Sequence, residues 1–340
     1  METEPDTRRD RDLAVASGVG SMPGTDVHEA VRVVRGELPD LPHLPELPER
    51  GTHAGMTARA LAVVADLGFD LQPAGWRLTD APGADHRRAR SLLAEDLDAL
   101  EEQAGGLVGE LKVQVAGPWT LAATVERPRG DRVLADHGAR RELAQALAEG
   151  LTRHVADVRR RLPDATLLVQ VDEPALPAVL AASVPTASGF GRHRAVDPPR
   201  ASEALEWVFA AIADAGATSV AHCCAADVPI ALLRGAGARA VSVDLDVLAA
   251  AAYDELGSAL DAGGRAFLGV VASTDPTSVP TDKQVVERVQ RLLDMLGFDP
   301  DEVVRQLVLT PSCGLAGATP SYARKALSLV RDSASRLSGA

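Results

Sequence analysis

The chain has 340 residues, of which 46% are hydrophobic and only 3% aromatic, and its 48 acidic and 35 basic side chains give a net charge of −13. This charge argues against nucleic acid and anionic membrane surfaces as partners. The chain has three cysteines, and this small, odd number does not make a disulfide framework. No apolar run approaches the roughly 18 residues that span a bilayer. We therefore expect a cytoplasmic protein whose core is built largely of Ala, Val and Leu.

Residues 1–12 are charged, contain proline and lack the apolar stretch of a signal peptide. We expect a disordered tail there, followed by a single domain over 13–340. In this domain short β-branched runs alternate with helical segments rich in Ala, Leu and Arg. The expected strands are 13–19, 112–116, 166–171, 218–222, 240–245, 266–271 and 306–310. The expected helices are 84–103, 137–162, 199–215, 228–235, 247–262, 282–296 and 320–337.

Near-continuous apolar strands that alternate with helices indicate a parallel sheet covered on both faces. Seven strands leave room for an eighth, which we place at 41–47, although its prolines make it a poor ladder strand. Residues 69–78 predict a hairpin inserted before the helix at 84–103. The pattern predicts an α/β fold of the TIM (β/α)8 barrel type. An open doubly wound sheet is the alternative.

Polar residues gather where the expected strands end. In barrels of this kind the chemistry lies at the carboxyl ends of the strands. The residues concerned are Gly20-Ser21, Gly117-Pro118, Asp172-Glu173, His222-Cys223-Cys224, Asp244 and Ser312-Cys313-Gly314. Their distribution favours a functional site at one end of the barrel.

Side chains alternate along a strand, so His222 and Cys224 face one way and Cys223 the other. Cys313 follows the last strand, and Asp244 can add a carboxylate. One imidazole, two thiolates and a carboxylate suit tetrahedral Zn²⁺. The alternative is that the cysteines are small buried apolar residues. Zinc binding deprotonates a thiol and leaves its sulfur nucleophilic, so the set points to S-alkylation of a thiol.

These residues carry a resemblance to the C-terminal catalytic barrel of the cobalamin-independent methionine synthase family. The resemblance extends over residues 15–326. The family's His-x-Cys zinc motif matches His222-Cys223-Cys224, and its Cys-Gly-Leu matches Cys313-Gly314-Leu315. Its fourth ligand is a Glu, in whose place this chain has Asp244. The resemblance implies a zinc methyltransferase of methionine biosynthesis that acts on the thiol of homocysteine.

The resemblance also implies a substrate site. The family's Ile-Gly-Ser turn, which holds the substrate carboxylate, matches Val19-Gly20-Ser21. Its Gln-x-Asp-Glu-Pro-Ala segment matches residues 170–175, so Asp172 would pair with the substrate ammonium and Glu173 would orient it. A second ammonium-binding acid follows strand 2; Glu46 is the candidate and Glu49 the alternative.

The folate half of the family pattern is missing. Full-length members have two barrels and take the methyl group from a polyglutamylated folate. The Trp that stacks on folate is replaced by Thr124, and a His after strand 7 aligns near Thr274. The expected donor is therefore not the usual folate, and a methyl-corrinoid or a corrinoid protein is the candidate.

Two other functions remain open. Gly-Pro-Trp-Thr-Leu at 117–121 resembles uroporphyrinogen decarboxylase, which needs no metal. That interpretation leaves the His/Cys/Cys set unexplained and lacks a basic pocket for a polycarboxylate. The other alternative is a zinc- and thiol-binding barrel without methyl transfer.

Overall fold

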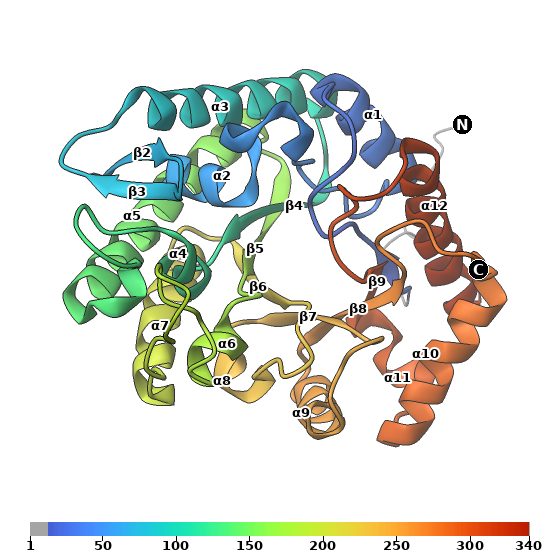
Figure 1. Ribbon diagram of the computed structural model, residues 1–340. Helices are drawn as coiled ribbons and strands as arrows, with labels where there is room; N and C mark the ends of the chain where they lie inside the picture. Colours follow the sequence, from blue (N-terminus) through green and yellow to red (C-terminus); the bar gives the residue numbers. More distant parts are fainter. Residues whose placement is uncertain (1–12, 340) are drawn as a thin grey trace.

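In the computed structural model, which describes residues 13–339, seven parallel strands form one strongly curled sheet (Figure 1). The expected tail at 1–12 lies outside the described residues. The sheet order is β1-β9-β8-β7-β6-β5-β4, so the strands from β4 to β9 lie in chain order and β1 pairs with β9. A doubly wound sheet would reverse its order at a switch point. The strands are β1 (Val15–Ala16), β4 (Gly109–Ala116), β5 (Ala165–Asp172), β6 (Thr218–Cys223), β7 (Ala240–Asp244), β8 (Arg265–Val271) and β9 (Leu307–Pro311).

Helices surround the sheet, and an antiparallel hairpin of β2 (Gly68–Gln72) and β3 (Gly75–Thr79) precedes α3 as expected. The α-helices are α1 (Val27–Glu37), α2 (Met56–Val63), α3 (Ala84–Ala104), α4 (Pro118–Thr124), α5 (His137–Arg161), α6 (Leu176–Leu180), α7 (Pro198–Asp214), α8 (Ile230–Gly235), α9 (Ala250–Asp261), α10 (Asp282–Leu296), α11 (Pro300–Val303) and α12 (Pro320–Leu337). Within residues 13–339 no helix is both long and apolar enough to span a membrane.

The gap between β1 and β4 is filled by residues 41–47, which make isolated bridges instead of a ladder. On one side Leu44 N donates to Lys112 O at 2.9 Å. On the other side Glu46 N donates to Gly20 O at 3.1 Å. The prolines of this segment have no N–H to donate, which prevents regular pairing. The prediction of a regular eighth strand, and with it of a closed barrel, is therefore wrong. The sheet has seven strands and curls like a barrel, but no continuous ladder closes it.

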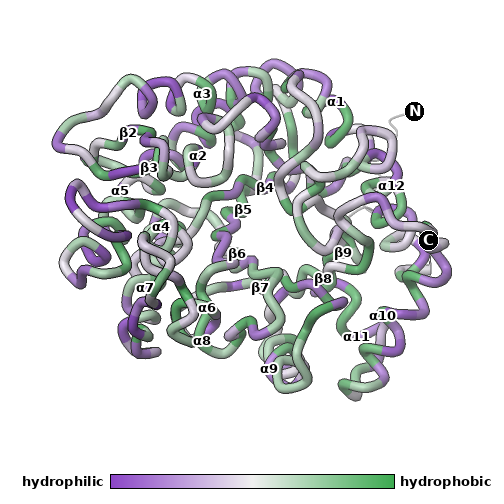
Figure 2. The backbone as a smooth tube through the Cα atoms, viewed as in Figure 1, coloured by the Kyte–Doolittle hydropathy of each residue, from purple (hydrophilic) through white to green (hydrophobic). Residues whose placement is uncertain are grey.

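The inner face of the curl is layered with a period of two residues. Its floor is a separate apolar cluster to which five neighbouring strands each give one side chain, together with Leu41. Every second residue faces the same side of a strand, so the next inward positions lie above this floor. From floor to rim the series are Leu168-Gln170-Asp172 on β5, Val220-His222-Cys224 on and after β6, and Ala240-Ser242-Asp244 on β7. Hydrophilic stretches on β4, β5 and β6 are visible as purple in Figure 2.

The opposite face of the sheet packs on the helices and forms the main core. Helix ends follow local signals. Thr281 and Gln284 form a capping box at the start of α10, and α10 ends at Gly297, whose φ is 79°. Helices α10 and α12 span the residues expected for them. The strand expected at 13–19 is regular only over Val15–Ala16.

A substitution at Gly150 tests how closely α5 packs on the end of α2. A Cβ at this position would lie 2.0 Å from Val63 O. We expect Gly150→Ala to lower the free energy of unfolding by about 1–3 kcal/mol, because backbone would have to shift. The matched control is Gly36→Ala in α1, where a Cβ meets nothing within 4 Å. That change should raise stability by roughly 0.5–1 kcal/mol through helix propensity. Urea unfolding of both variants measures the difference, and equal effects would contradict the packing.

Candidate metal and substrate site

Three side chains expected to bind metal meet at the rim of the curled sheet. His222 lies near the end of β6, Cys224 directly after it, and Cys313 follows β9. Their ligand atoms all lie within 4.8 Å of one another, although β7 and β8 separate the two strands in the sheet. The two Sγ atoms are 3.2 Å apart. The curl of the sheet therefore brings together residues 89 positions apart.

His222 is oriented for a ligand role. Its Nδ1 lies 2.9 Å from Ser242 Oγ, on the adjacent strand and in the same layer. Its Nε2 is buried and has no hydrogen-bond partner. A buried polar atom without a partner is costly, and metal-binding imidazoles are commonly held through their other nitrogen. The three side chains thus fit a borderline-soft metal such as zinc.

The pKa values of the two cluster thiols shift in opposite directions. The hydrogen bond between the two Sγ atoms lowers the pKa of Cys313 to about 4, and His222 acts in the same direction. The same bond raises the pKa of Cys224. Cys223 points into the sheet's packed face, where burial raises its pKa to about 12. Cys223 is therefore buried in the core, whereas Cys224, the next residue, contacts Cys313.

Asp244 is not part of the cluster of three. It is partly exposed at the end of β7, and its Oδ1 accepts a hydrogen bond from Asp246 N at 2.8 Å. Burial raises its pKa, and the nearby Cys313 contributes in the same direction. Asp244 therefore lies near the thiols with its carboxylate engaged elsewhere.

The turn after β1 connects the metal cluster to the expected substrate site. Leu315 N donates to Ser21 O at 2.7 Å, and Ser21 also bridges to Glu46. Gly314 is in close contact with this turn: a Cβ there would lie 2.0 Å from Ser21 Oγ. A residue larger than glycine after Cys313 would displace the serine hydroxyl.

Asp172 lies beside this turn at the end of β5, opposite His222 in the β5–β6 register. It is 6% exposed, and Gln170 Nε2 donates to its Oδ1 at 2.7 Å. Burial raises the pKa of Asp172 to about 7, while His222 opposes the shift. A buried carboxylate with this environment is suited to a cationic partner.

Glu46 is buried in the same region, whereas the alternative acid Glu49 is exposed and accepts from Gly24 N. Both contacts of Glu46 use Oε1: Gln114 Nε2 lies at 3.0 Å and Arg59 Nε at 3.4 Å. Gln114 Nε2 also donates to Leu44 O, which fixes the amide orientation. Its buried Oε1 is then left without a donor. An ammonium group could donate to this Gln114 oxygen and also pair with the neighbouring Glu46 carboxylate.

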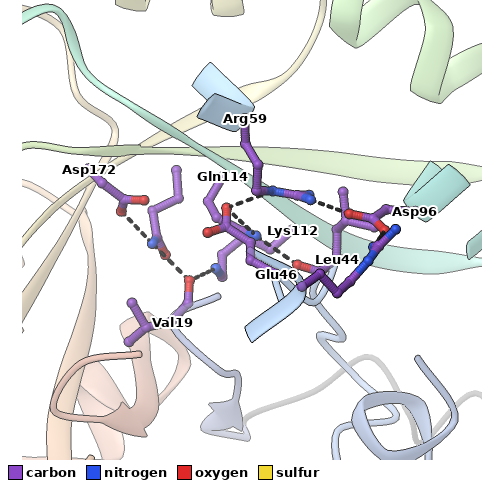
Figure 3. A network of polar contacts seen from close by, with 10 residues as sticks. Val19, Leu44, Glu46, Arg59, Asp96, Lys112, Gln114 and Asp172 are labelled. Carbon is purple, nitrogen blue, oxygen red and sulfur yellow. Dashed lines mark hydrogen bonds and ion pairs between the residues drawn. The ribbon is translucent and has the colours of Figure 1, made fainter. Parts of the chain in front are cut away.

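Lys112 was missed by the sequence analysis. Its side chain is fully buried between the two acids, and Nζ donates to Val19 O at 2.8 Å (Figure 3). Gln170 Nε2 donates to the same carbonyl at 2.9 Å. Burial lowers the pKa of Lys112 to about 8, against the attraction of Asp172 and Glu46. A lysine inside an apolar strand was the available signal, since buried lysines need partners.

Glu173 is fully buried with its carboxylate on the N-terminus of α4. Trp119 N donates to Oε1 at 2.9 Å, and Thr120 N and Oγ1 each donate to Oε2 at 2.7 Å. A carboxylate that accepts hydrogen bonds from several N–H groups at the start of a helix anchors that helix. Through it, Asp172 and α4 are held in a fixed relation.

The two positions at which the folate-contacting residues of the family pattern are replaced are both exposed. Thr124 is the last residue of α4 and donates to Thr120 O at 2.8 Å. Thr274 lies in the loop after β8, where a Cβ added to Gly317 would lie 3.3 Å from its Cγ2. Neither side chain offers an aromatic face or a titratable proton.

Fold and site together define a barrel-like α/β protein with an imidazole–thiolate cluster at its strand ends. Residues 110–336 match the family described as "Cobalamin-independent synthase, Catalytic domain". This match covers more than half of the chain, and the chain belongs to that family. No curated protein matches the sequence.

A solved structure agrees with this fold. A B12-independent methionine synthase from Shewanella sp. W3-18-1, in complex with selenomethionine, is similar at a TM-score of 0.64 and 13% identity. The alignment covers 96% of this chain and 98% of that one. A β-galactosidase from the psychrophilic Marinomonas ef1 reaches 0.47 at 11% identity, over 95% of this chain and 59% of that one. At these identities the likeness concerns the fold alone.

His43 gives a test of the buried region by pH. The side chain is 1% exposed, both ring nitrogens lack partners, and burial with the charge of Lys112 holds its pKa well below 6.5. The unfolded chain therefore binds a proton that the folded chain does not, so stability should fall as the pH drops below about 6.5. We expect His43→Leu to reduce this fall, measured as urea midpoints at about pH 7.5 and about pH 5.5. His28→Gln, at an exposed histidine, is the control. An unchanged slope in the His43 variant would contradict the burial of an uncharged ring.

Proposed function

We propose that this protein is a zinc-dependent methyltransferase that transfers a methyl group to the thiol of homocysteine, or of a similar thiol, to give methionine. The observation that carries the proposal is the cluster of His222, Cys224 and Cys313, with its buried and unpartnered imidazole nitrogen. Membership of the cobalamin-independent synthase family supports the reaction class. The ligand of the Shewanella structure, selenomethionine, is consistent with the proposed product.

The metal would be held by His222 Nε2 and the two thiolates, with Asp244 as the proposed fourth ligand. Bound zinc supplies a Lewis acid that keeps a substrate thiol deprotonated at neutral pH. Ser242 fixes the His222 ring so that Nε2 faces the thiols. Asp244 Oδ1 accepts from Asp246 N, so Oδ2 would be the oxygen that Asp244 offers to a metal.

The amino-acid part of the substrate would lie between the turn Val19-Gly20-Ser21 and the acids Asp172 and Glu46. Backbone N–H groups and the Ser21 hydroxyl suit the substrate carboxylate. Asp172, Glu46 and the unpaired Gln114 Oε1 suit its ammonium group. Lys112 and Gln170 orient the turn by donating to Val19 O, and Glu173 orients Asp172 through α4.

The methyl donor is proposed to differ from the folate of the full-length enzymes. Thr124 and Thr274 replace the residues that stack on folate and donate a proton in the pattern this chain resembles. A methyl-corrinoid, free or carried by a protein, is the proposed donor. A corrinoid positions its own methyl group and needs no aromatic platform from this chain.

The metal cluster favours this proposal over the two alternatives. A decarboxylase that needs no metal leaves the aligned imidazole and thiols without a role. A zinc- and thiol-binding barrel without methyl transfer would bind zinc and homocysteine but show no turnover with any donor. Metal analysis therefore distinguishes the first alternative, and a donor screen the second.

Zinc content tests the ligand set. Wild-type protein should carry about one equivalent of zinc, and Cys224→Ser and Cys313→Ser should each lose it, because a serine hydroxyl is a poor zinc ligand. Cys223→Ala is the matched control, since that side chain packs in the core, and it should keep its zinc. Elemental analysis after dialysis gives the result. Unchanged zinc in either serine variant would remove that residue from the site.

A donor screen tests the second half of the proposal. With homocysteine and zinc-loaded protein, methylcobalamin should give methionine well above the protein-free rate. Methyltetrahydrofolate triglutamate should give almost none, because the folate-contacting residues are absent. Cys313→Ser serves as the inactive control for both donors. Turnover with the folate at a rate equal to that with the corrinoid would show the donor argument to be wrong.

A further inference from the structure

A cavity outside the sheet is lined by an unusual concentration of arginine. It lies where the N-termini of α5 and α7 meet α4 and has a volume of about 290 Å³ including its opening to solvent. Arg140 and Arg141 come from the start of α5, and Arg200 comes from the first turn of α7. The complete lining is Trp119, His137, Arg140, Arg141, Arg200, Glu203, Ala204 and Trp207.

These arginines lie where the helix dipoles disfavour a positive charge. The N-terminal end of a helix carries partial positive charge, so carboxylates are favoured there and cations are not. Neither α5 nor α7 has an acidic residue in its first turn. Arg200 Nη1 donates a hydrogen bond to the ring of His137, the first residue of α5, with Nε2 at 3.0 Å. Repulsion between Arg140 and Arg200, with burial, lowers the pKa of Arg140.

The three arginines also lack ion pairs within residues 13–339. No carboxylate oxygen lies within 4.0 Å of any of their guanidinium nitrogens, in a chain with 48 acidic residues. Arg140 Nε is buried without an acceptor. Asp136, the carboxylate that attracts Arg140, already caps α5 through Ala139 N and pairs with Arg127. Glu203, the one carboxylate of the lining, is exposed.

Two tryptophans hold the guanidinium groups in place. The guanidinium carbon of Arg140 lies 6.0 Å from the Trp119 ring centroid, and that of Arg141 lies 5.8 Å from Trp207. Trp119 is itself fixed, because its Nε1 donates to Ala201 O at 3.0 Å. Stacking on a ring face leaves the N–H donors of a guanidinium free for a further ligand.

We propose that this cavity binds the anionic group, phosphoryl or carboxylate, of a small molecule. Guanidinium forks match the oxygen pairs of both groups, and the two helix N-termini add favourable partial charge. The anion would supply the negatively charged partner that the arginines lack and would offset their mutual repulsion. This site is separate from the metal cluster and does not rest on the proposed methyl transfer.

Titration calorimetry with pyrophosphate and with citrate, at constant ionic strength, tests the proposal and separates the two sources. We expect one equivalent of at least one of them to bind. Binding should weaken by about tenfold or more in both Arg140→Gln and Arg200→Gln. Arg160→Gln, at an exposed arginine near the other end of α5, is the matched control and should bind as wild type does. Preference for pyrophosphate would assign a phosphoryl ligand, and preference for citrate a carboxylate.

Thermal unfolding gives a second readout that a purely structural arginine would not produce. Without anion, Arg200→Gln should raise Tm, because it removes a cation from a helix N-terminus. With saturating anion the wild type should gain more in Tm than the variant does. The proposal is overturned if neither anion binds, or if binding is the same in Arg140→Gln, Arg200→Gln and wild type.

Discussion

The two-residue period of inward-facing side chains on parallel strands is the constraint on which the site depends. It places an apolar floor beneath a polar layer and the polar layer beneath the rim. Since the strands are in register, Asp172 lies opposite His222, and Ser242 lies beside it. The ligand and substrate residues therefore reach one level because of how the sheet is paired. Cys224, Cys313, Glu46 and the turn at Ser21 come from segments beyond the ladder.

Placing polar groups inside the curl requires that their charges balance. Lys112 and Arg59 lie among Asp172, Glu46 and Asp96, and every one of these side chains is nine-tenths or more buried. Removing one partner from such a set leaves an uncompensated buried charge, which costs several kcal/mol. The network shown in Figure 3 should therefore respond to mutation as a unit. The same balance explains why Lys112 can orient the Val19 carbonyl and also stabilise two anionic carboxylates.

The sequence alone could predict what depends on local pattern. Strand and helix positions, the hairpin, and the meeting of His222, Cys224 and Cys313 follow from periodicity and from the rule that strand ends converge. The prediction of an eighth ladder strand was wrong because proline has no N–H to donate. Residues 41–47 therefore pair through single bridges. Lys112 was missed because its partner, Val19 O, is 93 residues away. The orientation of Asp244 depends on a turn that leads to Asp246 N, which no periodicity encodes.

The arginines of this chain divide into two groups with different physical requirements. Arg59 and Arg50 contact Asp96 in the interior, so their charges are balanced by the fold itself. Arg140 and Arg200 lie at helix starts, near each other, and neither forms an ion pair within residues 13–339, although the chain has an excess of acids. A fold that balances its most deeply buried cations has the means to balance these less buried ones. That it leaves them without an ion pair at one cavity, where Trp119 holds Arg140 and His137 accepts from Arg200, is best explained by an anion that the chain does not itself provide.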